Sequence, residues 1–226
     1  MNVPVIAIDG VSGSGKGTLA AEVARRLGWH LLDSGALYRV VGVVCEHRGV
    51  ELGDEAAVVA VSQRLRIEFK ADGVWVDDED LSDAIRTEEA GTLASLVAQL
   101  PRLRAAIMQL QRDFARAPGL VADGRDMGTV VFPSAPLKIF LEASPEERAR
   151  RRYNQLKNKG LSVSLPALLA QIEERDARDR GRAVAPLEPA PDAHVLDSTK
   201  MSIHEVVDAA MRLIAQQGLL DTSSHP

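Results

Sequence analysis

The segment that most constrains this chain is the glycine-rich stretch of residues 10–18, which reads Gly-Val-Ser-Gly-Ser-Gly-Lys-Gly-Thr. Four residues separate its first glycine from a Gly-Lys pair, whose lysine is Lys16. Glycines let the backbone turn until several N–H groups point at one anion, and a helix that begins there adds partial positive charge. An apolar run, residues 3–8, precedes the stretch, and residues 18–27 carry apolar side chains at four-residue spacing. The pattern predicts a strand, a phosphate-binding loop (P-loop) and a helix, in that order.

One residue departs from the usual form of this loop. The common pattern has Ser or Thr directly after the lysine, whereas here Gly17 stands between Lys16 and Thr18. Direct coordination of Mg²⁺ by Thr18 is therefore not expected, and a metal held mainly through waters and phosphates is. The alternative, a glycine-rich turn with a surface lysine, is disfavoured because a strand and a helix flank the loop. The residues expected to hold the phosphates of the donor nucleotide are Gly10, Val11, Ser12, Gly13, Ser14, Gly15, Lys16, Gly17 and Thr18.

Composition bounds the class of protein. The chain has 226 residues, of which 46% are apolar and 26% charged, an ordinary balance for one globular domain with insertions. Its net charge of -5 argues against binding to duplex nucleic acid. Cys45 is the only cysteine, no segment approaches the ~20 apolar residues of a membrane span, and the first apolar run is too short for a signal peptide. We expect a soluble, cytoplasmic protein with no nucleic-acid or membrane partner, whose polar last residues, 221–226, fray.

Short β runs alternate with helical stretches along most of the chain, which predicts a doubly wound parallel α/β sheet. Two helices are predicted to begin at Ser144 and Ser202, because a glutamate three residues after each serine completes a capping box. The later apolar runs that suit buried parallel strands are residues 29–32, 120–122, 137–141 and 194–196.

The middle of the chain breaks this alternation. Residues 65–76 show alternating apolar and polar side chains, an Asp72-Gly73 turn signal and a second β run, which predicts a small hairpin. Residues 35–48 and 83–116 have helical patterns, the latter broken near Pro101. The expected organisation is a core of residues 1–34, 117–147 and 183–220, an inserted subdomain of about 35–116, and a short Arg-rich lid of about 148–182.

Three further segments carry distinctive motifs. They are residues 32–39, Leu-Asp-Ser-Gly-Ala-Leu-Tyr-Arg; residues 122–129, Ala-Asp-Gly-Arg-Asp-Met-Gly-Thr; and residues 174–180, Glu-Arg-Asp-Ala-Arg-Asp-Arg. All three resemble segments of bacterial cytidylate kinases. The last two are specific to this family, whereas a P-loop ending in Gly-Lys-Gly-Thr is similar to that of nucleoside monophosphate kinases in general. The match runs from about Val5 to about Leu213. The resemblance implies a monomer that transfers the γ-phosphoryl group of ATP to CMP or dCMP with Mg²⁺, with the insertion binding the acceptor.

The resemblance also implies which residues bind the acceptor nucleotide. Cytosine offers an amino donor and two acceptors, which suit a carboxylate and an arginine fork, so Asp126 and Arg104, with Ser95, would read the base. Uracil would set an oxygen against the carboxylate. Arg39 and Arg125 would hold the acceptor phosphate. From the residues alone, Arg104 is more simply an exposed arginine on a helix. The full set implied for the acceptor is Ser34, Arg39, Ser95, Arg104, Arg125, Asp126, Arg175, Asp179 and Arg182.

Phosphoryl transfer spreads negative charge over the transferred group, which calls for cations and a metal. Asp123 closes an apolar run at the place where a carboxylate would meet Mg²⁺ near the P-loop; the alternative is a turn residue at a strand end. Asp123 and Thr18 are the two candidates for contact with the metal through water. No general base is required, because the second pKa of a phosphate monoester is near ~6. The implied catalytic set is Lys16, Asp123, Arg125, Arg148, Arg152 and Arg182.

Two Arg-rich stretches leave an alternative open. Charge pattern alone favours solvated helices in which these arginines pair with nearby glutamates. The resemblance implies instead that one stretch covers ATP and the other faces the acceptor. The arginines concerned are Arg148, Arg151 and Arg152 in the first stretch and Arg175, Arg178 and Arg182 in the second, and the glutamates are Glu146, Glu147, Glu173 and Glu174.

Three other functions stay open from the residues alone. A different P-loop kinase would act on UMP, AMP or a metabolite. A regulatory or nucleic-acid-linked NTPase would hydrolyse ATP without an acceptor. A non-enzymatic module would bind a nucleotide and turn nothing over. The small size and the dense set of Arg and Asp favour a site for a second nucleotide.

Overall fold

A computed structural model describes residues 3–70 and 73–220. Contacts divide the chain into two compact units: Met1–Asp33 with Arg112–Pro226, here called the sheet unit, and Ser34–Gln111, here called the inserted unit. The inserted unit begins at 34 and ends at 111, where the sequence predicts about 35 and 116. The fraying expected at residues 221–226 concerns residues outside the described part of the chain.

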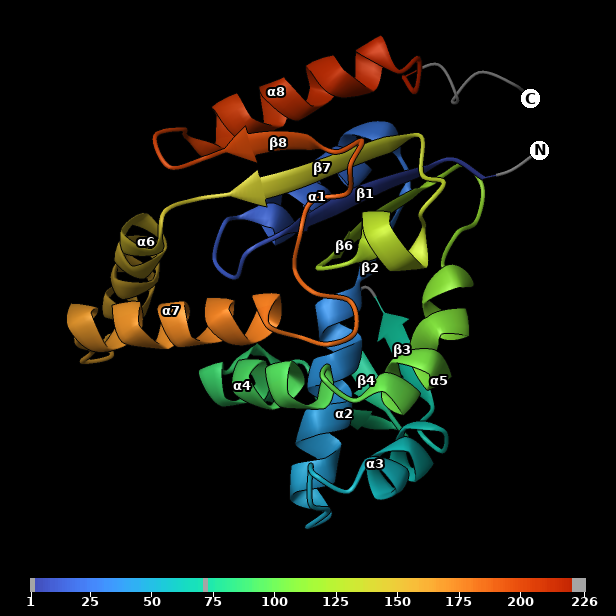
Figure 1. Ribbon diagram of the computed structural model, residues 1–226, viewed down its shortest axis with the longest axis vertical. Coiled ribbons are helices and arrows are strands. Elements are labelled where there is room, and N and C mark those ends of the chain that lie inside the picture. The colour runs from blue at the N-terminus through green and yellow to red at the C-terminus, as the bar shows by residue number, and fades with distance from the viewer. Residues whose placement is uncertain (1–2, 71–72, 221–226) are drawn as a thin grey trace. The chain divides into compact units, whose positions relative to one another are not determined.

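The sheet unit is built on a five-stranded parallel sheet with the order β2-β6-β1-β7-β8 (Figure 1). Its strands are β1 (Val5–Gly10), β2 (His30–Asp33), β6 (Leu120–Gly124), β7 (Leu137–Glu142) and β8 (His194–Asp197). The three central strands are buried almost throughout, as their continuous apolar runs predict. The predicted doubly wound α/β fold is confirmed, and each predicted strand is present within two residues of its expected bounds.

The register brings the carboxyl ends of the central strands to one edge. Asp9 of β1 lies opposite Gly124 of β6 and Phe140 of β7, and Asp33 of β2 lies opposite Asp123 of β6. In open α/β sheets, ligands bind beyond the carboxyl ends of the strands where the strand order reverses. The segments that follow β1 and β6 are therefore at the expected position of a site.

The sheet unit also contains helical segments. They are α1 (Lys16–Leu27), a π-helical turn η2 (Met127–Val131), α6 (Pro145–Asn158), α7 (Leu165–Arg180) and α8 (Ile203–Gln216). Helices α1 and α8 pack on one face, where Ile8, Leu19 and Ile214 belong to one buried apolar cluster. The predicted helix starts are confirmed: the side chain of Ser144 accepts from the N–H of Glu147, and the Ser202 capping box is complete.

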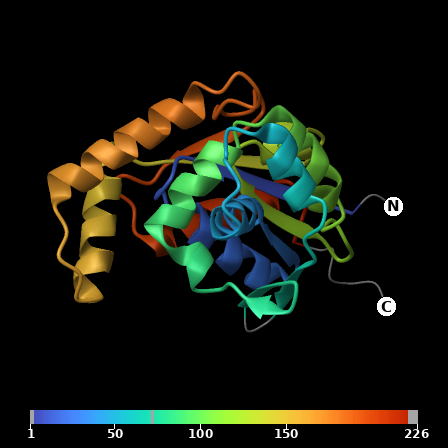
Figure 2. The same ribbon diagram turned by 90° about the horizontal axis from the view of Figure 1, so that it is seen from below.

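Helices α6 and α7 pack against each other around a separate apolar cluster that includes Ala149, Leu156 and Leu168. They lie side by side in both Figure 1 and Figure 2. The Arg-rich segment of the sequence is thus a helical pair with its own small core.

The inserted unit combines helices with a three-stranded antiparallel sheet of order β3-β4-β5. Phe69 lies opposite Val74 in the predicted hairpin, which is confirmed, although Asp72 of its turn lies outside the described residues. Helix α3 and strand β5 were not predicted. The elements are α2 (Ser34–His47), α3 (Glu55–Ser62), β3 (Ile67–Lys70), β4 (Gly73–Val76), β5 (Glu79–Asp80), a 3₁₀ turn η1 (Ala84–Arg86), α4 (Glu88–Val97) and α5 (Pro101–Arg112).

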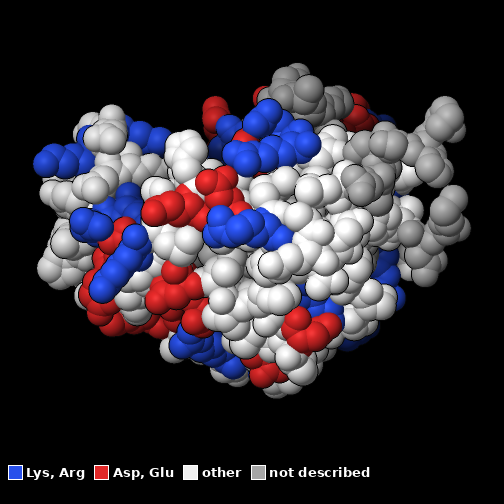
Figure 3. Space-filling view, turned by 90° about the horizontal axis from the view of Figure 1, so that it is seen from above, with Lys and Arg blue, Asp and Glu red and all other residues white. Residues whose placement is uncertain are grey.

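The length and polarity of the helices and the distribution of surface charge are relevant to contact with a membrane. Within residues 3–70 and 73–220, every helix is too short or too polar to cross a membrane. On the face drawn in Figure 3, Lys and Arg lie interspersed with Asp and Glu.

Candidate active site

The P-loop runs from the end of β1 to the start of α1, as predicted. Gly10 has φ 152°, and a Cβ at this position would lie 2.1 Å from the carbonyl oxygen of Leu141 on the neighbouring strand. Only glycine fits here, because the loop leaves the sheet directly against the backbone of β7. Helix α1 then begins at Lys16 and has no acidic residue in its own first turn, an arrangement that leaves its N-terminal N–H groups available to an anion.

Lys16 lies in the middle of this site. Its side chain is buried, and its Nζ donates a hydrogen bond to the carbonyl oxygen of Val11 at 3.3 Å. Burial, followed by the positive charge of Arg125, lowers the pKa of Lys16 to about 7, although Asp123 acts in the opposite direction. A phosphate dianion bound beside this amine would restore its charge.

Asp123 stands at the carboxyl end of β6 and is buried. Its Oδ2 would lie 3.2 Å from a Cβ placed on Gly17, so the carboxylate touches the residue that separates Lys16 from Thr18. This close approach is a physical reason for glycine at position 17. The alternative of a turn residue at the strand end is wrong, since Asp123 lies within β6, which continues to Gly124, and is only 8% exposed.

Asp9 is a residue of the site that the sequence analysis missed. Its two carboxylate oxygens accept hydrogen bonds from the backbone N–H groups of Met127 and Gly128, at 2.8 and 2.7 Å. Burial raises the pKa of Asp9 to about 7, against the lowering effect of these two hydrogen bonds. The carboxylate ties β1 to the start of η2, directly after Asp126. The available signal was a carboxylate at the end of an otherwise apolar, buried strand.

Asp179 organises a group of arginines. Arg125 donates its Nε to Oδ2 of Asp179 at 3.1 Å, and Arg182 donates to Oδ1. Burial acts to raise the pKa of Asp179, but the surrounding arginines outweigh it and lower that pKa. Helix α7 ends at Arg180, so Arg182 lies beyond the helix and still reaches this carboxylate. The cations that lower the pKa are Arg125, Arg182 and Arg175.

Lys16 and the arginines around Asp179 are parts of one positive region in the sheet unit. Arg125 and Arg175 both lower the pKa of Lys16, which means that their charges lie near its amine. The structure thus brings together the predicted residues of the P-loop, β6 and α7. Among the described residues, no group of three or more His, Cys, Asp or Glu is arranged to hold a metal ion.

The arginines of α6 differ sharply in their surroundings. Arg148 is the largest fully buried side chain, and its guanidinium donates to the carbonyl oxygens of Ser12 and Ala143 and to both oxygens of Asp176. The solvated-helix alternative is wrong for Arg148, but Arg178 on α7 pairs with Glu174 at 2.7 Å, as that alternative predicts. The neighbouring exposed Arg150 pairs with Glu147.

Arg152 is half-buried and donates to Gln155 at 2.7 Å. Its expected role over ATP stays a prediction.

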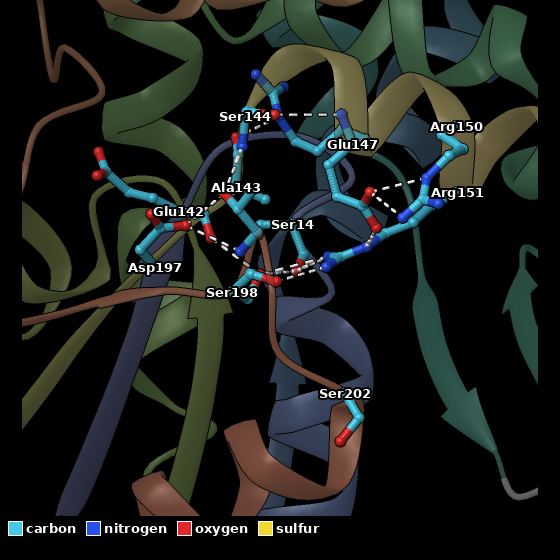
Figure 4. Close-up of polar contacts among 12 residues, drawn as sticks. Ser14, Glu142, Ala143, Ser144, Glu147, Arg150, Arg151, Asp197, Ser198 and Ser202 are labelled. Atoms are coloured by element: carbon cyan, nitrogen blue, oxygen red, sulfur yellow. Dashed lines mark hydrogen bonds and ion pairs between the residues drawn. The ribbon is translucent and has the colours of Figure 1, made fainter.

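A cavity of about 350 Å³ opens beside the P-loop in the sheet unit. Arg151 lines it, and Figure 4 shows this side chain pointing toward Ser14 and Ser198. The guanidinium donates to the Ser14 carbonyl at 3.2 Å, to the Ser198 carbonyl at 2.6 Å and to Glu147 at 2.9 Å. The remaining lining residues are Gly15, Thr18, Leu141, Met201, Ser202, Ile203 and Val206.

Four predicted site residues belong to the inserted unit. Ser34 and Arg39 lie on α2, Ser95 on α4 and Arg104 on α5. Arg104 is only 5% exposed; it lies over the ring of Tyr38 at 5.5 Å and donates to the carbonyl of Ala98 at 3.1 Å. The alternative of an ordinary exposed arginine is therefore wrong. Ser34 and Ser95 are also buried.

Comparison with known proteins identifies the family. The cytidylate kinase family matches residues 6–216. The chain belongs to the cytidylate kinase family. A cytidylate kinase from Photobacterium profundum is 57% identical over 219 residues, covering 95% of this chain and 96% of that protein. A cytidylate kinase from Pseudomonas aeruginosa is 58% identical over 222 residues, covering 96% and 97%.

A solved structure supports the fold. An uncharacterised protein from Eubacterium ventriosum matches with a TM-score of 0.52 at 13% identity, covering 94% of this chain and 98% of that one. The predicted resemblance to cytidylate kinases, which are phosphotransferases, is confirmed at the level of the family. The roles of individual site residues stay predictions.

Proposed function

We propose that the chain transfers the γ-phosphoryl group of ATP to CMP or dCMP, giving ADP and CDP or dCDP. The observation that carries this proposal is the group of positive charges formed by the buried Lys16 with the half-buried Arg125 and Arg175, next to the P-loop, in a member of the cytidylate kinase family. Cations gathered in a partly water-excluded place suit a reaction in which two phosphate groups meet.

The donor side of the reaction is assigned to the P-loop. Its backbone N–H groups and the start of α1 would hold the triphosphate, and Lys16 would neutralise charge on the transferred group. The cavity beside Ser14 and Thr18 borders the same loop, so it would take the nucleoside end of ATP.

The residues fit a metal held largely by ATP itself. The Asp123 carboxylate lies against Gly17, beside Thr18, which suits contact with Mg²⁺ through water. Mg²⁺ when bound would neutralise the charge of the phosphates. No set of three protein ligands is needed for that arrangement.

The acceptor side is assigned to the arginines around Asp179 and to the inserted unit. Arg125 and Arg182 would hold the acceptor phosphate in line, with Asp179 fixing their planes. Asp126, Arg104 and Ser95 would read cytosine. The acceptor phosphate is mostly a dianion at neutral pH, because its second pKa is near ~6, so it attacks without a protein base.

The test is a coupled ADP-release assay with ATP, Mg²⁺ and CMP, dCMP, UMP or AMP, together with a control that lacks an acceptor. We expect strong turnover with CMP and dCMP. Turnover with UMP or AMP alone would overturn the proposed specificity and leave a P-loop kinase. ADP release that is independent of any acceptor would indicate a hydrolytic NTPase instead. A monomeric state and a cytoplasmic location stay predictions.

A further inference from the structure

The outer side of the P-loop is held by two arginines of α6. Arg148 donates to the carbonyl oxygen of Ser12 at 3.0 Å, and Arg151 donates to that of Ser14 at 3.2 Å. The two arginines are three residues apart on one helix, and the two carbonyls are two residues apart in the loop. The hydroxyl of Ser198 also donates to the Ser14 carbonyl at 3.2 Å.

The direction of these carbonyls decides the direction of the neighbouring amides. A peptide unit is planar and trans, so the C=O of one residue and the N–H of the next point opposite ways. When the Ser12 and Ser14 carbonyls turn toward α6, the N–H groups of Gly13 and Gly15 turn away from it. A phosphate in the loop needs amides that converge on one point.

Contacts with other residues hold the side chains of both arginines in place. The Arg148 side chain is 1% exposed and is gripped from the far side by Asp176 of α7, at 3.1 and 2.5 Å. Its methylenes lie 3.6 to 3.9 Å from the position that a Cβ on Gly13 would take, so the side chain runs alongside the loop. Arg151 is fixed by Glu147 and by the Ser198 carbonyl (Figure 4).

We propose that Arg148 and Arg151 are positioning residues that brace the P-loop from outside, orienting its amides for the donor phosphates. Asp176 acts as the anchor of Arg148. This inference rests on the proposed placement of the ATP phosphates in residues 10–18. It assigns the base of the α6–α7 pair a function in donor binding that is exerted through the loop, in addition to the place of Arg151 in the lining of the neighbouring cavity.

A matched pair of variants isolates the brace. Arg150→Gln and Arg151→Gln remove the same charge from adjacent positions, and both arginines bond Glu147. Only Arg151 reaches the P-loop. The probe is inorganic tripolyphosphate, which carries the phosphates of ATP without its base or sugar. Its inhibition constant against ATP therefore reports the loop alone.

We expect Arg151→Gln to raise the inhibition constant of tripolyphosphate and the KM for ATP about tenfold, the effect of losing a charge-assisted hydrogen bond. The KM for CMP at saturating ATP should change less than about twofold, and Arg150→Gln should leave all three values unchanged. A purely structural role would lower the amount of active enzyme and the melting temperature without changing the inhibition constant.

Arg148→Lys separates bracing from direct contact, because this buried side chain lies behind the loop. The Arg148→Lys variant should also raise the inhibition constant of tripolyphosphate. If this variant does not fold, Asp176→Asn is used in its place, because that substitution removes the partner of Arg148 and keeps the arginine. Two outcomes would overturn the brace. One is an inhibition constant of tripolyphosphate that increases in Arg151→Gln but not in the Arg148 or Asp176 variant. The other is a KM for ATP that increases while the inhibition constant of tripolyphosphate is unchanged. Tripolyphosphate that fails to compete with ATP in the wild type would remove the phosphate placement itself, and the brace with it.

Discussion

Replacing Asp9 by asparagine preserves the shape of a buried side chain but removes its charge. In the folded chain, burial raises the pKa of Asp9 from 3.8 to about 7. The folded state therefore holds this proton more tightly than the unfolded state, so the contribution of Asp9 to stability is full at low pH and is lost as the pH rises through 7. With these two pKa values, the free energy of unfolding of the wild type decreases by about 2.5 kcal/mol between pH 5 and pH 8. The Asp9→Asn variant has no titratable group at position 9, so its stability should not show this decrease.

The assay follows the free energy of unfolding in urea at those two pH values. Trp29 is buried in the sheet unit, and the chain has two tryptophans, so a Trp75→Phe background makes fluorescence report that unit. The destabilisation of Asp9→Asn relative to this background should be about 2.5 kcal/mol larger at pH 5 than at pH 8. Asp192→Asn is the control, because a hydrogen bond from Lys138 lowers the pKa of the exposed Asp192, which stays charged throughout. Equal destabilisation by Asp9→Asn at both pH values would refute the argument from a buried carboxylate.

Four further predictions concern the P-loop and the acceptor site. Lys16→Met should lower turnover by about 10²-fold or more while circular dichroism shows an intact fold; near-normal turnover would contradict the P-loop assignment. Because phosphates raise the pKa of Lys16 from about 7, ATP binding at pH 8 should also take up a proton, seen by calorimetry in two buffers and absent in Lys16→Met. Asp126→Ala should weaken the preference for CMP over UMP more than it raises the KM for ATP; equal losses would rule it out as a base reader. Gly10→Ala should lower the free energy of unfolding by about 3 kcal/mol or more, because the new Cβ would meet the Leu141 backbone. Gly53→Ala is the control: open space surrounds this position, so the free energy of unfolding should change by about 0.5 kcal/mol or less. Similar melting temperatures for the two variants would contradict this prediction.

Much of the fold was predictable because its signals are local. The apolar run of β1, the glycines of the P-loop, the serine cap at Ser144 and the capping box at Ser202 each depend on residues within a few positions. Helix α3 and strand β5 were missed because both are short, eight and two residues, and a pattern needs length to stand out.

The site was predicted less completely. The motifs identified the P-loop, Asp123 and the arginines around Asp179, which do meet in the sheet unit. Asp9 was missed because its two partners are 118 and 119 residues away along the chain. An arginine on a predicted helix was more simply read as exposed at position 104, whereas Tyr38 and the Ala98 carbonyl provide a buried place for Arg104.

By itself, the sequence determined the chemistry that is available: a loop able to bind phosphate, an α/β alternation around it and a family-specific set of arginines and aspartates. These follow from backbone freedom, side-chain period and residue type, all of which act over short distances along the chain. Only the tertiary structure decided which charged groups lose water and which partners they meet. Arg148 and Arg150 are two residues apart on one helix, yet the first is buried against Asp176 and the P-loop and the second pairs with Glu147 in solvent. The difference arises because desolvation depends on the elements packed against each face of a helix, which the sequence of that helix does not specify.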